Sequence, residues 1–448
     1  MAVSLNPIHL DGTTLEGGGQ LLRVALTLSS LTGIPIHVSD IRGKRAPKSG
    51  KGEGGGLKSS HLAGVEWLVR ATNAETIGMA VKSRDLLFRP VHSPGNDIPP
   101  ASASQATAFA KKNDIPIKDP ADEVWKDVYH DGVLVRRDSH IQMSTPGSIF
   151  LVLQAILPYI LLSARPTLDP DSSHDELVVV PLRLTIAGGT NVTQSLSYEY
   201  ASQVFFPMLE LKLGIKPIKM TLQRRGWSMG TTSVGSVALD ITPLTPGSCL
   251  PAFRFEDRGE LVKIHVSILA PTPAARASVR ERALDKIQRV YPDVEVLFPV
   301  NDNSRHPKRL YLLLVAETSN GYRLGRDWLY DRRIKEATMD DHAKDLVGKV
   351  IGELSHELKH GGCVDEYLQD QLVVFQALSE GRAVVDSKND GGSLHTQTAR
   401  WVVEQILGLD FDKGSCNGIG FRAGQLGLHT GDSDLAVPLV KDLEQLQI

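Results

Sequence analysis

Apolar residues recur at two different spacings along the first part of the chain. Within residues 20–31 and 59–72 they fall three or four positions apart, which predicts two amphipathic helices, and Gly33 with Pro35 ends the first. Shorter apolar or alternating runs at 8–10, 34–41 and 84–90 predict strands. The order strand, helix, strand, helix, strand predicts an α/β layer.

The same pattern returns near the other end of the chain. Residues 364–379 predict a helix, 382–385 a strand, and the segment after His395 a second helix that runs to 407 and that Gly408 ends. Between the two regions, the strongly apolar segment 149–162 predicts a buried helix. It is too short to span a bilayer, and it contains Gln154 and Pro158.

Two segments interrupt these units. Residues 92–138 mix proline, serine, alanine and charge with little periodicity, which predicts a long insertion. Residues 242–251 are rich in proline and predict a linker, and a strand, a helix and a strand are expected after it at 260–269, 274–290 and 310–315. We therefore expect the first part of a catalytic domain at 1–242, a smaller inserted α/β domain at 243–338, and the last part of the catalytic domain at 339–448.

Composition narrows the class of protein. With 41% hydrophobic and 23% charged residues in 448 positions, the chain reads as an ordinary globular protein with room for two or three domains. No secretory signal is visible, and three widely spaced cysteines argue for a reducing compartment and against a structural zinc site. We expect an intracellular protein, in the nucleus or the cytoplasm, with no membrane partner.

Charge provides one local feature. The net charge of −3, from 49 basic and 52 acidic residues, excludes a general basic field for nucleic acid. Residues 42–58 nevertheless contain six basic side chains and one acid, Glu53. This basic segment is either a solvated loop or a binding site for RNA phosphates.

A histidine near a helix N-terminus provides candidate chemistry. The glycine-containing loop 389–392 leads to His395, which is predicted to lie just before the N-terminus of the next helix. The positive end of a helix favours a neutral imidazole and binds anionic oxygen, and a neutral imidazole is a nucleophile toward phosphorus. The chain has 14 histidines, and position alone also suits a structural role. The glycine loop 17–19 likewise lacks the endings of P-loop and dinucleotide motifs.

The glycine loop, the basic segment and His395 all belong to an ordered series of short motifs along the chain. Asp11-Gly12 and the run from Glu16 to Arg23 (EGGGQLLR) are followed by residues 41–45 (IRGKR), Gly56-Leu57 and His61-Leu62. Further along come Leu151–Gln154 with Leu157-Pro158, Gly188–Thr190, Glu366–Leu368 with Asp370–Leu372, and His395 with Thr398. This series resembles the RNA 3′-terminal phosphate cyclases over most of the chain outside the insertions.

The resemblance implies a fold and a reaction. The fold is a large domain of repeated units, each a four-stranded sheet packed on two helices, with a small α/β domain inserted late. The reaction uses ATP to convert an RNA 3′-phosphate into a 2′,3′-cyclic phosphate, through adenylyl-histidine and an RNA adenylate. The protein contributes positioning and charge neutralisation.

The resemblance also implies roles for single residues. His395 would be the nucleophile and Glu16 a ligand of Mg²⁺ or Mn²⁺. Arg23, Arg42 and Arg45 would bind phosphates, and Gln154 and Asp370 would line the same nucleotide and RNA site. Each also has a structural alternative. Glu16 suits a solvated loop, Arg23 a partner of a carboxylate, and Gln154 a satisfied amide in the core.

The chain departs from the family pattern at several places. Ser60 stands where the family usually has glutamine, and residues 48–55 are additional. The turn before the 149–162 helix is Ser144-Thr145-Pro146-Gly147-Ser148, and residues 227–235 replace a triple-glycine motif. These departures concern catalytic efficiency and RNA fit more than the fold.

Three other functions compete with cyclisation. A branch of the family acts in ribosome assembly without the nucleophilic histidine. His395 argues against that non-catalytic function in pre-rRNA processing, but the departures from the family pattern keep it open as the alternative. Enolpyruvyl transferases have a similar repeated fold but lack the glycine-loop and His-x-x-Thr elements. Finally, Lys388-Asn389-Asp390-Gly391 matches the KxDG pattern of polynucleotide ligases, a short pattern that recurs by chance without the other ligase motifs.

Overall fold

The predicted α/β class with repeated sheet units is confirmed by four sheets of four or five strands. The computed structural model describes residues 6–45, 54–91, 124–130, 133–163, 167–168, 177–332, 339–389 and 391–425. Most of the predicted insertions, at 48–53 and 92–123, lies outside these ranges. Within the described part of the chain, no helix combines the length and the hydropathy that crossing a bilayer requires.

The first unit is a four-stranded sheet in the order β1-β2-β4-β3, with two helices on one face. Strand β2 alternates as its sequence predicts, since Ile36 and Val38 are buried and His37 and Ser39 are less so. The elements are β1 (Ile8–Asp11), α1 (Gly19–Thr32), β2 (Ile36–Ser39), α2 (Ser59–Thr72), β3 (Glu75–Ile77) and β4 (Leu86–Arg89).

The second unit is a five-stranded sheet in the order β10-β11-β9-β6-β5. Its elements are β5 (Lys126–His130), β6 (Val133–Gln142), α4 (Ile149–Leu162), β9 (Leu182–Gly188), α5 (Tyr198–Tyr200), a π-helical turn (Ala201–Phe205), α6 (Phe206–Leu213), β10 (Lys219–Arg224) and β11 (Gly235–Ile241). A two-stranded ribbon of β7 (Thr167–Leu168) and β8 (Leu177–Val178) lies between α4 and β9 in the chain. Helix α4 has the bounds that its apolar run predicts.

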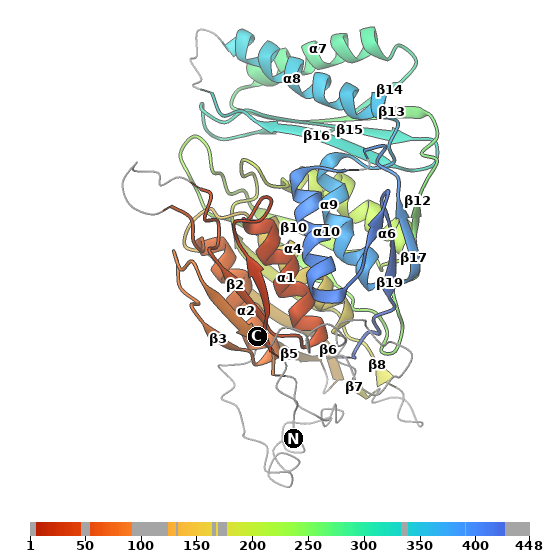
Figure 1. Ribbon diagram of the computed structural model, residues 1–448. Coiled ribbons are helices and arrows are strands. Elements are labelled where there is room, and N and C mark those ends of the chain that lie inside the picture. Colours follow the sequence, from red (N-terminus) through yellow and green to blue (C-terminus); the bar gives the residue numbers. More distant parts are fainter. Residues whose placement is uncertain are drawn as a thin grey trace.

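The third unit is a four-stranded sheet in the order β12-β17-β19-β18 with helices α9 and α10. Its elements are β12 (Arg254–Phe255), α9 (Glu366–Leu378), β17 (Glu380–Val385), α10 (Leu394–Leu407), β18 (Phe411–Asp412) and β19 (Ser415–Ile419). Helix α1 packs against α2, α4 and α10, so the helices of the three units meet in the middle of the molecule. Figure 1 shows this layer between the sheet of β2 and β3 on one side and that of β17 and β19 on the other.

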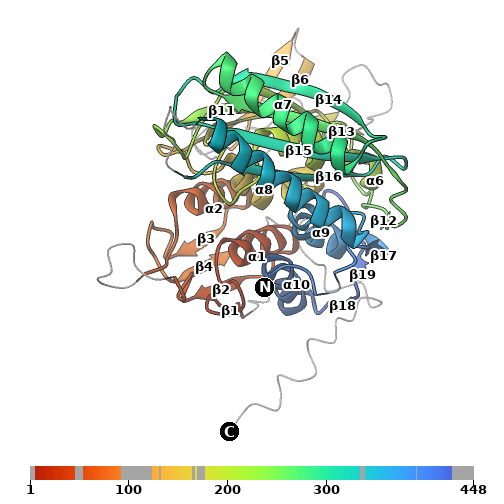
Figure 2. The same cartoon turned by 90° about the horizontal axis from the view of Figure 1, so that it is seen from above.

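The inserted unit is a sheet in the order β14-β13-β15-β16. Its elements are β13 (Leu261–Ala270), α7 (Pro273–Val290), β14 (Glu295–Asn303), β15 (Tyr311–Thr318), β16 (Arg323–Leu329) and α8 (Met339–His360). Both faces of β15 are buried. Leu312 and Leu314 contact the core under α7 and α8, and Leu313 and Val315 face the core of the main body. Figures 1 and 2 show α7 and α8 on the outer side of this sheet.

Elements on either side of the inserted sheet contact different parts of the molecule. Strand β12 pairs with β17, and Phe253 O accepts a hydrogen bond from Val384 N at 2.9 Å, so residues just before the insertion belong to the third sheet. Helix α8 packs on β15, β16 and α7 and buries Leu346 and Val350 there. These contacts assign β12 to the third sheet and α8 to the inserted sheet, and the division of the chain at 243–338 stays a prediction. A strand–helix order cannot tell which sheet a helix covers.

Part of the predicted insertion at 92–138 is also regular structure. Strand β6 pairs in parallel with β9, and β5 pairs with β6 at the edge of the second sheet. In β6, Ser139 and Ile141 are buried and His140 and Gln142 are exposed, which is the alternation of a half-buried strand. The charged residues 136–138 interrupt the apolar positions and hide this period in the sequence.

Candidate active site

The glycine loop between β1 and α1 forms one wall of a large cavity. Gly17 adopts a left-handed backbone with φ 56°, and a side chain there would collide with the carbonyl oxygen of Gly12. Helix α1 then begins at Gly19, and Gly18 at its N-cap position provides no side chain to cap it. The backbone N–H groups at this helix end are thus free of a capping side chain and carry the positive end of the helix dipole.

Glu16 lies in the same loop and is held by three contacts. Its Oε2 accepts a hydrogen bond from Gly18 N at 2.7 Å, and its Oε1 accepts one from Arg45 Nη2 at 3.0 Å. Its backbone N donates to Thr398 Oγ1 at 3.1 Å, and that hydroxyl donates to Leu394 O at 2.7 Å. Thr398 therefore fixes the first turn of α10 to the glycine loop.

His395 is the second residue of α10, whereas the sequence pattern predicts that it lies just before the helix. Ser393 caps the helix, and its side chain accepts a hydrogen bond from Thr396 N at 3.2 Å. The imidazole lies at the surface of the cavity. Desolvation lowers the pKa of His395 and outweighs the opposite effect of the Glu16 charge, so the ring is neutral at pH 7.

Two of the predicted arginines belong to the basic segment, and one is on α1. Arg42 N donates to Gly17 O at 2.8 Å, and its Nη1 donates to Gly56 O at 3.1 Å. Arg23 is buried, donates from Nη2 to Gln20 Oε1 at 2.7 Å, and has no partner for Nε among the described residues. Burial lowers the pKa of Arg23 to about 10, which leaves the guanidinium charged at neutral pH.

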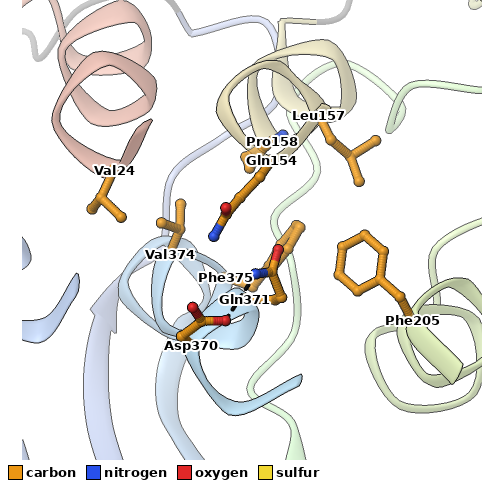
Figure 3. A pocket seen from close by; sticks show the side chains of 9 residues that line it. All are labelled: Val24, Gln154, Leu157, Pro158, Phe205, Asp370, Gln371, Val374 and Phe375. Atoms are coloured by element: carbon orange, nitrogen blue, oxygen red, sulfur yellow. Dashed lines mark hydrogen bonds between the residues drawn. The ribbon is translucent and has the colours of Figure 1, made fainter. Parts of the chain in front are cut away.

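Gln154 and Asp370 form the floor of the cavity. Gln154 Nε2 donates to Gln20 Oε1 at 3.2 Å, and Gln371 Nε2 donates to Asp370 Oδ1 at 2.8 Å. Figure 3 shows the Gln154 side chain of α4 directed toward Asp370 and Gln371 of α9, around a second, small cavity of about 10 Å³. Burial raises the pKa of Asp370 to about 7, and the nearby Arg23 charge opposes this shift.

All of these side chains meet in one cavity of about 670 Å³. This volume lies within the range of small-molecule binding sites. The residues predicted from the sequence that line the cavity are Glu16, Arg23, Arg42, Arg45, Gln154, Asp370 and His395. Lys388 of the ligase-like pattern does not line it and instead forms an ion pair with Asp386 at 2.6 Å. Lys48 and Lys51 lie outside the described residues.

The opposite wall comes from the inserted unit and α9. Arg326 stacks on the Tyr367 ring at 4.4 Å, and it is paired with Glu366 at 3.0 Å and with Glu357. Asp327 accepts hydrogen bonds from Ser197 Oγ at 2.7 Å and Tyr311 OH at 2.9 Å. The two cations of this wall, Arg326 and Lys349, are thus already paired with carboxylates. The glycine-loop wall carries Arg23, Arg42, Arg45 and Lys58 against Glu16 and therefore attracts anions.

Sequence reasoning missed some of the lining residues, and His61 is the main one. His61 is the third residue of α2 and is buried, and its Nδ1 accepts a hydrogen bond from Lys58 N at 3.3 Å. Burial lowers its pKa well below the usual value, and the charges of Arg23, Lys58 and Arg42 add to this effect. The sequence contains a signal for His61, because it lies at the start of a predicted helix directly after the basic segment. His395 similarly lies at the start of a helix after a glycine loop.

A divalent cation fits this cavity only together with a bound molecule whose phosphate oxygens also contact the ion. Among the described residues, no three side chains of the metal-binding types form a group that would hold a metal ion. Mg²⁺ is often bound through one or two carboxylates plus substrate phosphates. Glu16 provides one carboxylate beside the cationic wall, which agrees with a site that phosphate oxygens complete.

Comparison with known proteins gives a consistent result. The family model described as RNA 3′-terminal phosphate cyclase matches residues 14–109 and 126–413. A protein of Pyrococcus abyssi named RNA 3′-terminal phosphate cyclase is 30% identical over 410 residues, which is 90% of this chain and 94% of the relative. A protein of the same name from Drosophila melanogaster is 27% identical over 431 residues, covering 92% and 97%. A relative from Dictyostelium discoideum named probable RNA 3′-terminal phosphate cyclase is 26% identical, covering 90% and 77%.

Proposed function

The chain belongs to the RNA 3′-terminal phosphate cyclase family, and on this basis we propose that it uses ATP to convert an RNA 3′-phosphate end into a 2′,3′-cyclic phosphate. The observation that carries the proposal is that His395 lines the same cavity as Glu16 and three arginines. A neutral imidazole beside a cationic wall suits attack on a nucleotide phosphate.

The reaction proceeds in three displacements at phosphorus. A ring nitrogen of His395 attacks the α-phosphorus of ATP, an N–P bond forms, and pyrophosphate leaves. An oxygen of the RNA 3′-phosphate then attacks the same phosphorus, which breaks the N–P bond and joins AMP to the RNA end. Finally the neighbouring 2′-hydroxyl attacks the 3′-phosphorus, loses its proton and expels AMP.

The residues of the chain serve these steps by orientation and charge. Arg42 is tied to the glycine loop and Arg45 to Glu16, so both guanidinium groups lie near the start of α1. There they neutralise phosphate oxygens, with bidentate hydrogen bonds that lysine does not reproduce. Thr398 keeps His395 and Glu16 in a fixed relation, because it links Glu16 N to the first turn of α10.

Glu16 is the carboxylate that would hold Mg²⁺ or Mn²⁺. The ion, when bound, supplies positive charge to phosphate oxygens during their displacement. Because Oε1 of Glu16 also accepts a hydrogen bond from Arg45, the carboxylate and the guanidinium are adjacent on the same wall. Replacing Glu16 with alanine should depress AMP attachment to the protein, with partial recovery at high metal concentration.

Labelling with ATP tests the nucleophile. We expect purified protein, incubated with α-labelled ATP and Mg²⁺ or Mn²⁺, to carry labelled AMP that the His395→Ala variant lacks. Lys388→Ala is the matched control, since Lys388 belongs to the competing pattern but does not line the cavity. Label lost in Lys388→Ala and kept in His395→Ala would assign the chemistry to lysine instead.

A second assay tests the product. An RNA with a labelled 3′-terminal phosphate should become resistant to phosphatase when its end is cyclised. The His395→Ala variant should still cyclise RNA that already carries an adenylylated 3′-phosphate, because that step needs positioning and not the nucleophile. If the wild type gave neither labelled protein nor resistant RNA, the non-catalytic function in ribosome assembly would be favoured.

A further inference from the structure

We propose that His61 is a phosphate ligand of the site, which donates its Nε2–H to a phosphate oxygen in front of the N-terminus of α1. This inference rests on the proposed function and adds a residue and a specific hydrogen bond to it. His61 is 8% exposed and lines the cavity, although it is not needed as a nucleophile. Its environment defines which ring nitrogen is the donor and where that donor lies.

The first step concerns the tautomer. Lys58 N donates a hydrogen bond to His61 Nδ1 at 3.3 Å, so the lone pair of Nδ1 is used as an acceptor. In a neutral imidazole one nitrogen accepts and the other carries the proton, so the proton of His61 is on Nε2. The backbone of the helix start thereby fixes the ring as a donor toward the cavity.

The second step concerns position. A Cβ atom placed on Gly19 would lie 2.9 Å from His61 Nε2 and 2.5 Å from Arg23 Nη1. Both donors thus approach one point beside the first residue of α1, where glycine leaves the space open. Arg23 is 8% exposed, and its Nε has no partner among the described residues. Two nearly buried donors and an uncapped helix end therefore converge on the same place.

The third step concerns charge. Burial and the charges of Arg23, Lys58 and Arg42 hold the pKa of His61 well below its usual value, so the ring is neutral over the working pH range. A neutral donor adds a directed hydrogen bond without adding another positive charge to a wall that already has four cations. Such a bond to a charged oxygen is stronger than one between neutral groups.

The phosphate in question belongs either to ATP or to the 3′ end of the RNA. Both present the same oxygen atoms, so the two sources are separated by assay. The first arm measures AMP attachment to the protein against ATP concentration, with no RNA present. The second arm measures discharge of the pre-labelled protein in a single turnover against the concentration of RNA with a 3′-phosphate.

Two substitutions separate the two nitrogens of His61. His61→Asn places an amide near the position of Nδ1, so it keeps an acceptor for Lys58 N but loses the donor toward the cavity. His61→Gln reaches the position of Nε2 with an amide N–H but loses the acceptor. If His61 binds phosphate, His61→Asn should raise the half-saturating concentration in one arm by roughly ten- to a hundredfold, and His61→Gln by much less.

A purely structural role predicts the reverse order. His61→Asn would then behave as the wild type in both arms, and His61→Gln would be impaired together with its melting temperature. That result would overturn the proposal. Because His61→Asn preserves the contact with Lys58 N, it is the variant expected to remain folded, and its thermal unfolding is measured alongside the kinetics.

A binding measurement keeps this test independent of catalysis. Inorganic pyrophosphate is titrated into the wild type and His61→Asn, and binding is followed by calorimetry. We expect binding roughly tenfold or more weaker in the variant. Equal binding by the two proteins, or no binding by the wild type, would contradict the role of His61. A wild type that binds pyrophosphate but takes up no AMP would instead contradict the proposed function.

Discussion

Two helices carry a histidine in their first turn into the same cavity, and they differ in what caps them. Helix α10 is capped by the Ser393 side chain, so the ring of His395 is not needed for that purpose. At the start of α2, the cap residue is Lys58, whose side chain has no acceptor for a backbone N–H, and the ring of His61 accepts the hydrogen bond from Lys58 N. The capping residue therefore decides whether a histidine at a helix start keeps both nitrogens available.

Burial separates the two histidines further. His61 is 8% exposed and lies among Arg23, Lys58 and Arg42, whereas His395 lies at the cavity surface, where the Glu16 charge partly opposes the lowering of its pKa by desolvation. Both rings are neutral at pH 7, but only His395 combines a free lone pair with access for a nucleotide. The proposed nucleophile and the proposed donor are thus the same residue type, each in the first turn of a helix.

The largest effect should come from removing each ring in turn. His395→Ala removes the attacking atom, so the initial rate of AMP attachment should fall by about a thousandfold or more. His61→Ala removes one hydrogen bond to phosphate, so we expect a loss of about ten- to a hundredfold. Initial rates with labelled ATP, at saturating and subsaturating concentrations, measure both. Equal losses would mean that the two histidines do not have different roles.

The next effect should come from the link between α10 and the glycine loop. Thr398→Val keeps the volume of the side chain but leaves Glu16 N without its acceptor, which costs about 1–3 kcal/mol when a buried group is involved. We expect AMP attachment to slow by about tenfold, with the metal concentration for half activity increased.

Thr398→Ser is the matched control, because serine retains the hydroxyl. It should restore most of the rate and the metal dependence. If valine and serine behaved alike, the hydroxyl would not position His395 relative to Glu16.

A pH profile should distinguish the nucleophile from the donor. The pKa of His395 is lowered, so the neutral form persists below the ordinary histidine pKa, and the rate of AMP attachment should fall only as the pH drops through this lowered value. The limb should have a slope of about one decade per pH unit. Stopped-flow or quench measurements of the rate of AMP attachment against pH, at constant ionic strength, test this prediction, and the His61→Gln variant is measured in parallel as a control. A midpoint above about 6.5 would contradict the neutral nucleophile.

The smallest effect should come from the cap itself. Ser393→Ala removes the acceptor for Thr396 N and should cost about 1 kcal/mol of stability. AMP attachment should decrease a few-fold, since the first turn of α10 frays while His395 remains present. Denaturant unfolding and labelling rates measured on the same preparation check this. A loss as large as that of His395→Ala would indicate that the cap, and not the ring, limits the reaction.

Much of the helical part of the fold follows from the sequence. The bounds of α2 and α4 agree with the apolar spacing, α1 extends one residue further than predicted at each end, and α10 begins before His395 instead of after it. Gly33 and Gly408 are the C-caps of α1 and α10, as their positions predict, whereas Asn73 and Ser163 end α2 and α4. The strands β5 and β6 were not predicted, since charges at 136–138 interrupt their apolar alternation. Pairing with β9 determines this part of the sheet, and pairing is not a local property.

Prediction of the candidate site depended more on the resemblance to the cyclase family than prediction of the helices did. Charge and spacing mark residues 42–58 and His395, but nothing in a local pattern brings residue 16 next to residue 398. The position of His61 at the start of a helix can be read from the sequence. Its tautomer and its burial, on which its proposed role as a ligand depends, are properties of the folded chain. The identity of the capping group at α2 is visible only in three dimensions.

One pair of departures from the family pattern also has a structural explanation. A Cβ atom on Gly147 would lie 3.0 Å from Ser60 Cβ, and Ser59 Oγ is 3.1 Å from Thr145 Oγ1. The turn at 144–148 thus packs directly on the start of α2. A glutamine at position 60 would have to compete with this turn for space. The small residue at position 60 and the proline-containing turn are therefore sterically compatible with each other.

The link between Glu16 and Thr398 has a consequence for how the protein acquires activity. The two residues are 382 positions apart, and the inserted unit, with its own core, lies between them in the chain. During synthesis, the sheet of β13–β16 with α7 and α8 has all of its elements before α10 emerges, whereas α1 must wait for α10 to complete its surroundings. Assembly of the candidate site is therefore a late, long-range event of folding, because a chain interrupted before α10 lacks both His395 and the contact of Thr398 with Glu16.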